Sequence, residues 1–438
     1  MSKHEHHIPT AFRREFAHWG AWRTRALVVA GAAAAGVVVV GFTWLAESAQ
    51  HLFFRLYALL GWWLLLWTPL VTALAAWLTR RYAPGASGSG IPQVMAALDP
   101  AVDPAQYGLF VSLRLSAAKI VLTALGLLGG LSLGREGPSV QIAAGVMRSL
   151  RRWLPARSGV SEHGLLVAGG AAGIAAAFNT PLAGVMFAIE ELSRTPEQRN
   201  SGLLVACIVL AGVIAVSLTG NATYFGVIHA GGTGWDLLLP GLLVAVLSGL
   251  AGGLFARLLA VSLAGQGRDV LSALRRRRPV LFAAVCGLLV ALIGLVTGGA
   301  AFGGGYSHTR AMLEGAEQLP AIYTLFKFLA TWLTTWSGVP AGIFAPSLAI
   351  GAALGNDVAQ LLHSPQAAAL IALGMVGFLA AVTQAPLTSF IIVMEMVDGH
   401  AMVLSLMACA LVASGASRVL TRPLYSVLAQ LQLKRLPA

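Results

Sequence analysis

Charged residues are scarce in this sequence. Only 11% of its 438 residues are Asp, Glu, Lys or Arg, whereas 57% are hydrophobic. This composition excludes a soluble globular protein of that length and is typical of a polytopic helical membrane protein. Cysteine is also rare: Cys207, Cys286 and Cys409 each lie in an apolar segment, and none belongs to a CxxC pair. We therefore expect three buried thiols, with no disulfide framework and no metal site.

Catalytic signatures are missing as well. The sequence has no HExxH motif, no GxSxG elbow and no matched pair of aspartates, so an intramembrane enzyme is disfavoured and no cofactor is expected. A cleavable signal peptide is not expected either, because the first apolar run begins only near Leu27. His4, His6 and His7 are interpreted as part of a solvated tail.

Acidic residues are fewer than basic ones. Seventeen Asp and Glu stand against 29 Lys and Arg, which gives a net charge of +12. The basic residues gather in short connecting segments, as the positive-inside rule describes, so we read them as topology signals and not as a nucleic-acid surface. They place these segments and both termini in the cytoplasm of a cell whose inner membrane holds the protein: Arg13, Arg14, Arg23, Arg25, Arg80, Arg81, Arg148, Arg151, Arg152, Arg275 to Arg278, Lys434 and Arg435.

Apolar segments of two lengths fill the chain. Residues 1–25 form a basic amphipathic segment that is expected to lie on the membrane surface. Long spans are predicted at 27–46, 56–78, 109–133, 203–218, 237–263, 280–296, 319–336 and 402–420. Shorter helices, below the ~20 residues that a span needs, are predicted at 93–98, 138–150, 165–178, 181–192, 342–354, 367–379, 386–396 and 423–433. Broken and re-entrant helices of this kind line the sites of transporters.

The most unusual stretch runs from Leu133 to Val140, inside a long apolar region. It contains Gly134, Arg135, Glu136, Gly137 and Pro138. A charged side chain at membrane depth costs roughly 2.5–3.5 kcal/mol on insertion scales. The glycines end one helix and Pro138 suits the first turn of the next, whose free N–H groups form an anion site. Glu136 would then compete with a permeating anion. The alternative is a kinked helix that buries an Arg135–Glu136 pair.

Two pairs of segments repeat along the chain. The run from Gly134 to Ser139 resembles the run from Gly342 to Ser347, 208 residues later. Pro181 with Glu190 resembles Pro386 with Glu395, 205 residues later. We interpret residues 26–220 and 221–438 as two homologous repeats. If each crosses the membrane an odd number of times, the second is inverted and the sites meet near the midplane.

Four motifs resemble those of the CLC family of chloride channels and proton/chloride exchangers. They are the GSGIP run from Gly88 through Gly90 to Pro92, the GREGP run from Gly134 to Pro138, the GxFxP run from Gly342 to Pro346, and Tyr425. The runs from Phe178 to Gly184 and from Ala385 to Thr388 are similar to the family too. The resemblance extends from the first span to Tyr425. It implies an all-α polytopic membrane protein with two inverted-topology repeats, and a homodimer in the lipid bilayer.

The resemblance also implies roles for individual residues. Ser89 and Tyr425 would bind a central chloride through their hydroxyls, and the backbone amides of Ile343 and Phe344 would complete that site. Hydroxyls and amides hold an anion without a full opposing charge, so the ion can leave again. Glu136 matches the gating glutamate and Glu191 the internal proton glutamate of the exchangers. The remaining positions, Arg135 and Lys119 among them, would support the site. Chloride/proton antiport is the function implied.

One departure from the family keeps an alternative open. Several exchangers carry glutamates directly after GSGIP, where this chain has Gln93, Val94 and Met95. Lys119 is therefore expected to lack a buried acidic partner, and a passive chloride channel of the same fold remains the second reading. Glu190 is interpreted as a solvated acid at a helix end. A fluoride exporter is disfavoured because Ser89 is the chloride-type residue.

Overall fold

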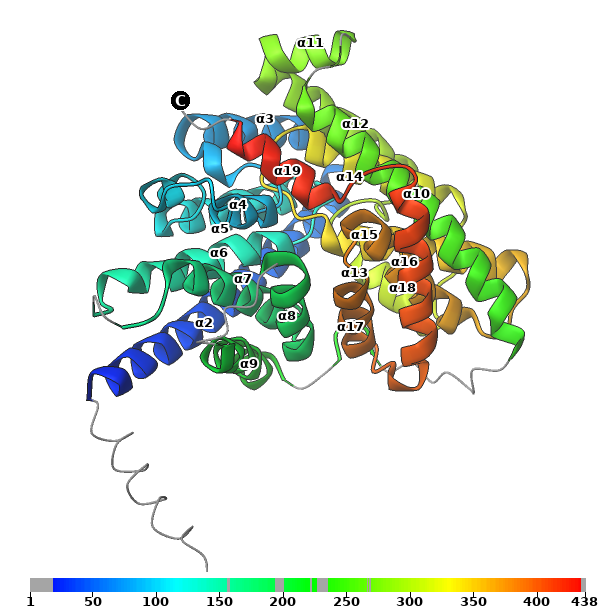
Figure 1. Ribbon diagram of the computed structural model, residues 1–438. Coiled ribbons are helices and arrows are strands. Elements are labelled where there is room, and N and C mark those ends of the chain that lie inside the picture. The colour runs from blue at the N-terminus through cyan, green and yellow to red at the C-terminus, as the bar shows by residue number, and fades with distance from the viewer. Residues whose placement is uncertain are drawn as a thin grey trace, which may run out of the picture.

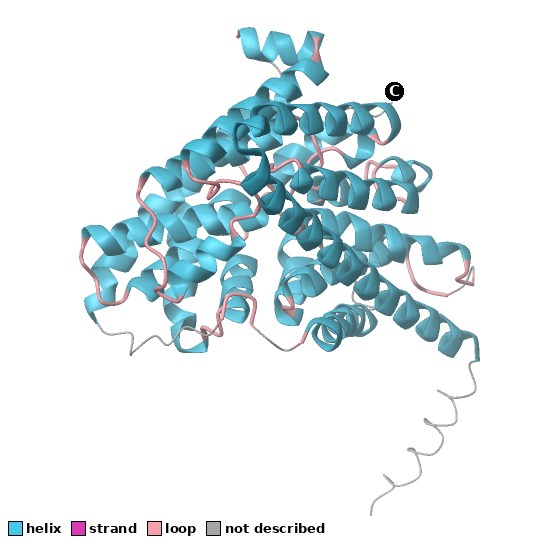
Figure 2. Ribbon diagram, turned by 180° about the vertical axis from the view of Figure 1, so that it is seen from behind, coloured by secondary structure: helices cyan, strands magenta, loops and turns pink. Residues whose placement is uncertain are grey.

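The computed structural model describes residues 19–155, 158–193, 201–220, 223–226, 235–265, 267 and 269–434. Within these ranges the protein is all-α: its regular elements are helices, and two isolated backbone bridges are the only extended pairing. Figure 2 shows helices throughout. Six segments are long and apolar enough to cross a membrane. The predicted all-α polytopic membrane fold is confirmed.

The helices divide about evenly between the two halves of the chain, and Figure 1 shows the halves as two neighbouring groups. The first half contains α2 (Trp19–Leu60), α3 (Leu64–Tyr82), α4 (Ile91–Ala97), α5 (Leu113–Leu128), α6 (Glu136–Ser149), α7 (Glu162–Phe178), α8 (Pro181–Phe187) and α9 (Ser201–Thr219). The second half contains α10 (Leu238–Ala264), α11 (Val270–Arg277), α12 (Pro279–Val296), α13 (Tyr306–Leu313), α14 (Ile322–Trp336), α15 (Phe344–Leu361), α16 (Ala367–Thr383), α17 (Pro386–Met396), α18 (Val403–Arg418) and α19 (Leu424–Leu433).

Two almost completely buried helices form the centre of each half. In the first half α7 packs along α6, and in the second half α16 packs along α15. Small residues make this close packing possible. A Cβ at Gly173 would lie 2.5 Å from the backbone oxygen of Ser139, and one at Gly374 would overlap the backbone of Gly351. Without a hydrophobic force between helices in lipid, such close approach is what holds membrane helices together.

The two halves are joined by α8 and α17, which lie side by side and antiparallel. The carboxylate of Glu190, just beyond the end of α8, accepts hydrogen bonds from the backbone N–H groups of Leu387 and Thr388 at the start of α17. Near the end of α17, Glu395 accepts from Leu182 and Ala183 at the start of α8. Because each helix end caps the start of the other, the two helices run in opposite directions. Glu190 is partly exposed at a helix end, as expected, but it also caps α17, which the sequence analysis did not predict.

Several predicted helix boundaries also need correction. The predicted spans 27–46 and 56–78 are not separated where expected, because α2 continues without a break to Leu60. Its polar residues Glu47 and His51 face a cavity, so they do not end the helix. The helices α11 and α13 were not predicted, and α15 extends to Leu361. Of the predicted segment 1–25, residues 1–18 lie outside the described residues and Trp19 to Arg25 begin α2.

Candidate anion-binding site

Two helix starts meet at the centre of the molecule. α6 begins at Glu136 and α15 begins at Phe344, and the segments that precede them are joined by a pair of backbone hydrogen bonds. Gly134 N–H donates to the Gly342 carbonyl at 2.8 Å, and Gly342 N–H donates back at 3.1 Å. A Cβ at Gly342 would come within 2.5 Å of the Gly134 oxygen, so this contact requires glycine. The bridge places two positive helix N-termini beside each other, as an anion site requires.

The Glu136 side chain lies between these helix starts. Its residue is only 1% exposed. The carboxylate interacts with the backbone amides of Arg135, Glu136 and Ala345, so it touches the starts of both α6 and α15. It also borders a cavity of about 510 Å3 that includes Glu47, Tyr224 and Tyr306 in its wall. The carboxylate thus lies against backbone amides at the starts of both helices.

Arg135 does not form the buried pair with Glu136 that the alternative reading required. Its guanidinium donates to Glu47 Oε1 at 2.7 Å and to the Tyr224 hydroxyl at 3.2 Å, and a weaker bond reaches the Thr43 carbonyl. Arg135 thus ties the start of α6 to α2. Glu136 is left to the backbone amides, and its Oε2 atom has no hydrogen-bond partner.

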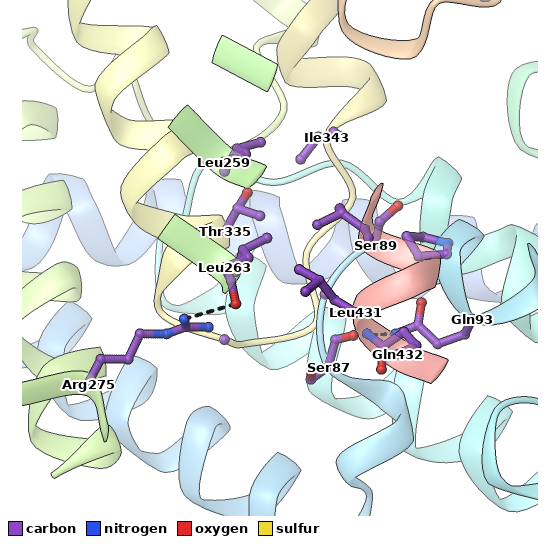
Figure 3. A pocket seen from close by; sticks show the side chains of 14 residues that line it. Ser87, Ser89, Gln93, Leu259, Leu263, Arg275, Thr335, Ile343, Leu431 and Gln432 are labelled. Carbon is purple, nitrogen blue, oxygen red and sulfur yellow. Dashed lines mark hydrogen bonds between the residues drawn. The ribbon is translucent and has the colours of Figure 1, made fainter. Parts of the chain in front are cut away.

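Ser89 and Tyr425 come together from opposite ends of the chain. Both are buried, at 5% and 0% exposure. The two hydroxyls lie close enough to each other to interact directly, and neither hydrogen-bonds to any other protein group. A buried hydroxyl without a partner is costly, so two of them together indicate a site built for a further acceptor. Figure 3 shows Ser89 beside a small cavity, with Ile343 on the same side of it.

Glycines let the Ser89 segment approach α6. Gly88 and Gly90 have φ values of 75° and 111°, which other residues rarely adopt. A Cβ on Gly137 would overlap the Ser89 Oγ atom. The glycines of the GSGIP and GREGP runs therefore have a steric reason, because each run leaves room for the other. Pro92, Pro138 and Pro346 all lie in the first turn of their helices, where a missing N–H costs nothing.

Lys119 holds the same segment in place. This fully buried lysine donates to the carbonyls of Ala86 and Gly88, each at 2.7 Å. Backbone oxygens take the place of the acidic partner that some exchangers would supply. Gln93 adds a further bond to the Ser87 carbonyl. Lys119 thus positions Ser89 through the backbone and lies behind the site.

Glu191 borders the site from the turn that follows α8. It is 8% exposed and lies in the π-helical turn Ala188–Leu192 that follows α8. Glu191 borders, with Phe344 and Tyr425, a packing gap too small to hold a water molecule. The rings of Phe344 and Tyr425 are stacked, with centroids 5.9 Å apart. The structure therefore brings Ser89, Glu136, Glu191, Ile343, Phe344 and Tyr425 together around one centre.

Comparison with known proteins identifies the family. The model of the voltage gated chloride channel family matches residues 71–418. The chain belongs to the voltage gated chloride channel family. Similar members include proteins named H(+)/Cl(-) exchange transporter ClcA: that of Citrobacter koseri is 34% identical over 393 residues, which covers 85% of this chain and 79% of the relative. The one from Klebsiella pneumoniae is 34% identical over 400 residues, covering 85% and 81%.

Solved structures agree with this family assignment. A slow cyanobacterial Cl−/H+ antiporter has 26% sequence identity and a TM-score of 0.81, covering 94% of this chain and 98% of its own. A CLC-type fluoride/proton antiporter has a TM-score of 0.76 at 23% identity, covering 92% and 97%, and shares the fold. The resemblance stated from the motifs is confirmed, as is the membrane location that it implied.

Some important residues were missed by the sequence analysis. Glu47, which pairs with Arg135, lies 88 residues away from it, and nothing in the sequence signals the pair. Lys327 could have been found: it follows Lys119 by 208 residues, the same offset as between Pro138 and Pro346. It is fully buried and donates to the carbonyls of Ala301 and Gly303. Each half thus uses one buried lysine to fix a glycine-rich loop.

Proposed function

We propose that this protein exchanges chloride for protons across a membrane. The observation that carries the proposal is the Glu136 carboxylate, which lies on the backbone amides at the paired starts of α6 and α15. A carboxylate there competes with chloride for the same positive helix ends. When the carboxylate takes up a proton, it loses its charge and its attraction to the helix ends, so a chloride ion can replace it. One residue would then carry the proton and control the anion.

Chloride would bind next to Glu136, at the hydroxyls of Ser89 and Tyr425, which have no protein partner besides each other. The amides of Ile343 and Phe344, at the first turn of α15, would complete its coordination. None of these groups carries a formal charge. Binding is then strong enough to strip water from the ion and weak enough to release it. Lys119 and Arg135 would fix the geometry of this site without touching the ion. Lys119 would do so through its bonds to backbone carbonyls, and Arg135 through its bond to Glu47.

Protons would reach Glu136 from the other side through Glu191. Its position beside Phe344 and Tyr425, away from the lining of the Ser89 cavity, supports separate routes for the proton and the anion. Separate routes for the two ions are what coupling requires. The names of relatives that are about a third identical over most of the chain support exchange over passive conduction.

We further propose that residues 26–220 and 221–438 are inverted repeats, and that the protein is a homodimer in a bacterial inner membrane with both termini in the cytoplasm. The antiparallel α8–α17 pair and the matched lysines support the repeats. Exposed apolar side chains on these two helices and on the turn after α8, Leu182, Leu387 and Ile189, are suited to lipid or to a second copy. Chemical cross-linking in liposomes, with each terminus tagged, tests the dimer and the orientation.

The decisive experiment uses liposomes that contain only this protein. An outward chloride gradient should drive proton movement in the parent, and Glu191→Gln should abolish proton movement while chloride still moves. Met396→Gln is a matched control, since Met396 holds the position 205 residues after Glu191 at the end of α17. Equal proton flux in parent and Glu191→Gln would remove Glu191 from the mechanism.

A passive chloride channel is the second candidate. The observation that favours it is the pairing of Lys119 with backbone carbonyls, with Gln93 where several exchangers carry a glutamate. In the same liposomes a channel would move chloride freely and leave the proton concentration unchanged under every chloride gradient. That outcome would replace the antiporter.

A further inference from the structure

The cavity below Ser89 does not end at a closed wall. It holds about 50 Å3 and contains Ser87, Gly338 and Arg275 in its lining. A second cavity, of about 400 Å3, is lined by the same three residues together with Arg80 and Ser337. Two cavities that share three wall residues adjoin each other. The larger one therefore lies where an anion bound for Ser89 could collect.

The charges along this passage are all positive. Arg80 and Arg275 are the charged residues among the described residues that line the two cavities, and no carboxylate joins them there. The cavity on the Glu136 side differs, because Glu47 and Glu136 line it along with Arg135. The two mouths of the pathway therefore present different fields to an approaching ion. Only the mouth with Arg275 is free of carboxylates in its described lining.

Arg275 is held firmly at this mouth. It lies in the last turn of α11, and its Nη1 atom donates to the Ser262 carbonyl at 2.8 Å and more weakly to the Leu263 carbonyl. Ser262 is itself fixed, because Trp332 and Trp336 donate to it. Figure 3 shows the Arg275 side chain reaching toward the cavity from the side opposite Ser89 and Gln93. The guanidinium is thus a stationary charge beside the passage.

A fixed positive charge at a low-dielectric mouth raises the local concentration of anions and speeds their entry. The effect weakens with salt, since the screening length falls from about 10 Å at 0.1 M to about 3 Å at 1 M ionic strength. We propose that Arg275, assisted by Arg80, forms an anion-collecting antechamber that feeds small monovalent anions to the Ser89 site. This inference rests on the proposed function and names the residues that set the apparent affinity from this side.

A purely structural role for Arg275 predicts something different. As an anchor between α11 and the end of α10, Arg275 would matter for folding and not for the salt dependence of transport. Arg276 is a matched control. Its Nη1 donates to the carbonyls of Gly265 and Gly267 at 2.7 and 2.8 Å, in the same anchoring manner, but it lies outside both cavity linings.

The test measures initial chloride flux against chloride concentration in liposomes, at about 0.1 M and about 1 M total salt made up with gluconate. Arg275→Gln should raise KM roughly 2- to 4-fold at the lower salt, with kcat unchanged, and the difference should disappear at the higher salt. Arg275→Lys, which keeps the charge, should restore the parent KM. Arg276→Gln should match the parent.

Three results would overturn the proposal: an unchanged KM in Arg275→Gln, a change that is equal at both salt concentrations, or the same change in Arg276→Gln. If Arg275→Gln does not fold, Arg80→Gln is measured in its place. It should raise KM by a smaller factor, and only at the lower salt concentration. An unchanged KM there would also overturn it. A parent protein that moves no chloride would instead refute the proposed function, so the two failures are distinguishable.

Discussion

The two halves of this protein share a scaffold and differ in chemistry. Each half has a broken helix with a proline in its first turn, a buried lysine that binds a glycine-rich loop, and a glutamate that caps a helix of the other half. At equivalent positions of the two repeats, however, the residue types differ. Glu136 of the first half corresponds to Phe344 of the second, and Glu191 corresponds to Met396. At these two pairs of matched positions, the acid belongs to the first half each time.

In the proposed mechanism, this difference lets a symmetric scaffold provide separate routes for chloride and for protons. If both halves carried the same acids, the two sides of the site would be chemically alike, and neither ion would have a route of its own. With Phe344 stacked on Tyr425 in the second half, that half supplies backbone amides and an apolar wall. The first half supplies the titratable groups. The predictions below remove or separate these features one at a time.

The largest effect is expected from Glu136→Gln, which removes the main chemical difference between the halves. An amide carries no exchangeable charge and cannot compete with chloride as an anion, so proton movement should fall to the level of protein-free liposomes while chloride still moves. The measurement is proton flux under a chloride gradient. Glu317→Gln, which removes an acid paired with His308, is the control and should leave coupling intact. Continued proton pumping by Glu136→Gln would contradict the assignment.

The paired lysines are expected to have the next largest effect. Lys119→Met leaves the Ala86 carbonyl without a donor and the Gly88 carbonyl with the Ala341 N–H alone, whereas Lys327→Met removes the lysine donor of both Ala301 and Gly303. Each buried carbonyl left unpaired costs about 1–3 kcal/mol. Both variants should therefore show a lower midpoint of thermal unfolding in detergent.

Chloride binding should separate the two lysines. The Lys119 acceptors adjoin Ser89, so Lys119→Met should also weaken chloride binding measured by calorimetry, whereas Lys327→Met should not. Equal losses of affinity in the two variants would show that the lysines act through their charge at a distance and not through the loops they hold.

The sequence analysis recovered the parts of this arrangement that depend on local signals. Proline and glycine mark helix starts, so the prediction for 386–396 matches α17 residue for residue. The sequence analysis failed where the structure depends on partners that are distant in the sequence. Glu190 has a partner 197 residues away in the other half, and only the fold reveals it. α11 was missed because its arginines hide an apolar pattern, although Asp269 caps its first turn at Ser272.

The candidate site was easier to predict than the contacts that support it. Ser89, Glu136, Glu191 and Tyr425 stand in motifs whose residue types and order are informative by themselves. Their convergence in space agrees with that prediction, while their roles stay proposals. The Arg135–Glu47 pair and the Arg275 antechamber join helices far apart in sequence, and the physical signal for them is geometry alone.

A smaller effect is expected at the hydroxyls that bind the ion. The loop that Lys327 binds lies 215 residues after the loop that Lys119 binds, so Gly304 is the counterpart of Ser89. Ser89→Ala and Tyr425→Ala each remove one hydrogen bond to a charged ligand, and each should weaken chloride binding roughly ten-fold. Calorimetry measures the change. Gly304→Ala is the control, because its Cβ would make ordinary contact at 3.5 Å. Unchanged affinity in both hydroxyl variants would rule out this site.

The smallest effect concerns the feature in which the halves are most alike. Glu190 caps α17 through bonds of 3.1 and 2.6 Å, and Glu395 caps α8 through bonds of 3.2 and 2.8 Å. A side chain that caps a helix start contributes about 0.5–2 kcal/mol, and a carboxylate there also gains from the helix dipole. Glu190→Ala and Glu395→Ala should therefore lower stability by similar amounts, measured by thermal unfolding in detergent.

The double variant sharpens this comparison. The caps lie at opposite ends of the antiparallel pair, and sites more than about 7–10 Å apart without shared partners have additive effects on stability. The loss in Glu190→Ala/Glu395→Ala should equal the sum of the single losses. Glu314→Ala, which breaks an exposed pair with Arg310, should change stability far less. If instead the double variant loses no more than either single variant, the first missing cap already separates α8 from α17, and the two caps form one cooperative joint between the halves.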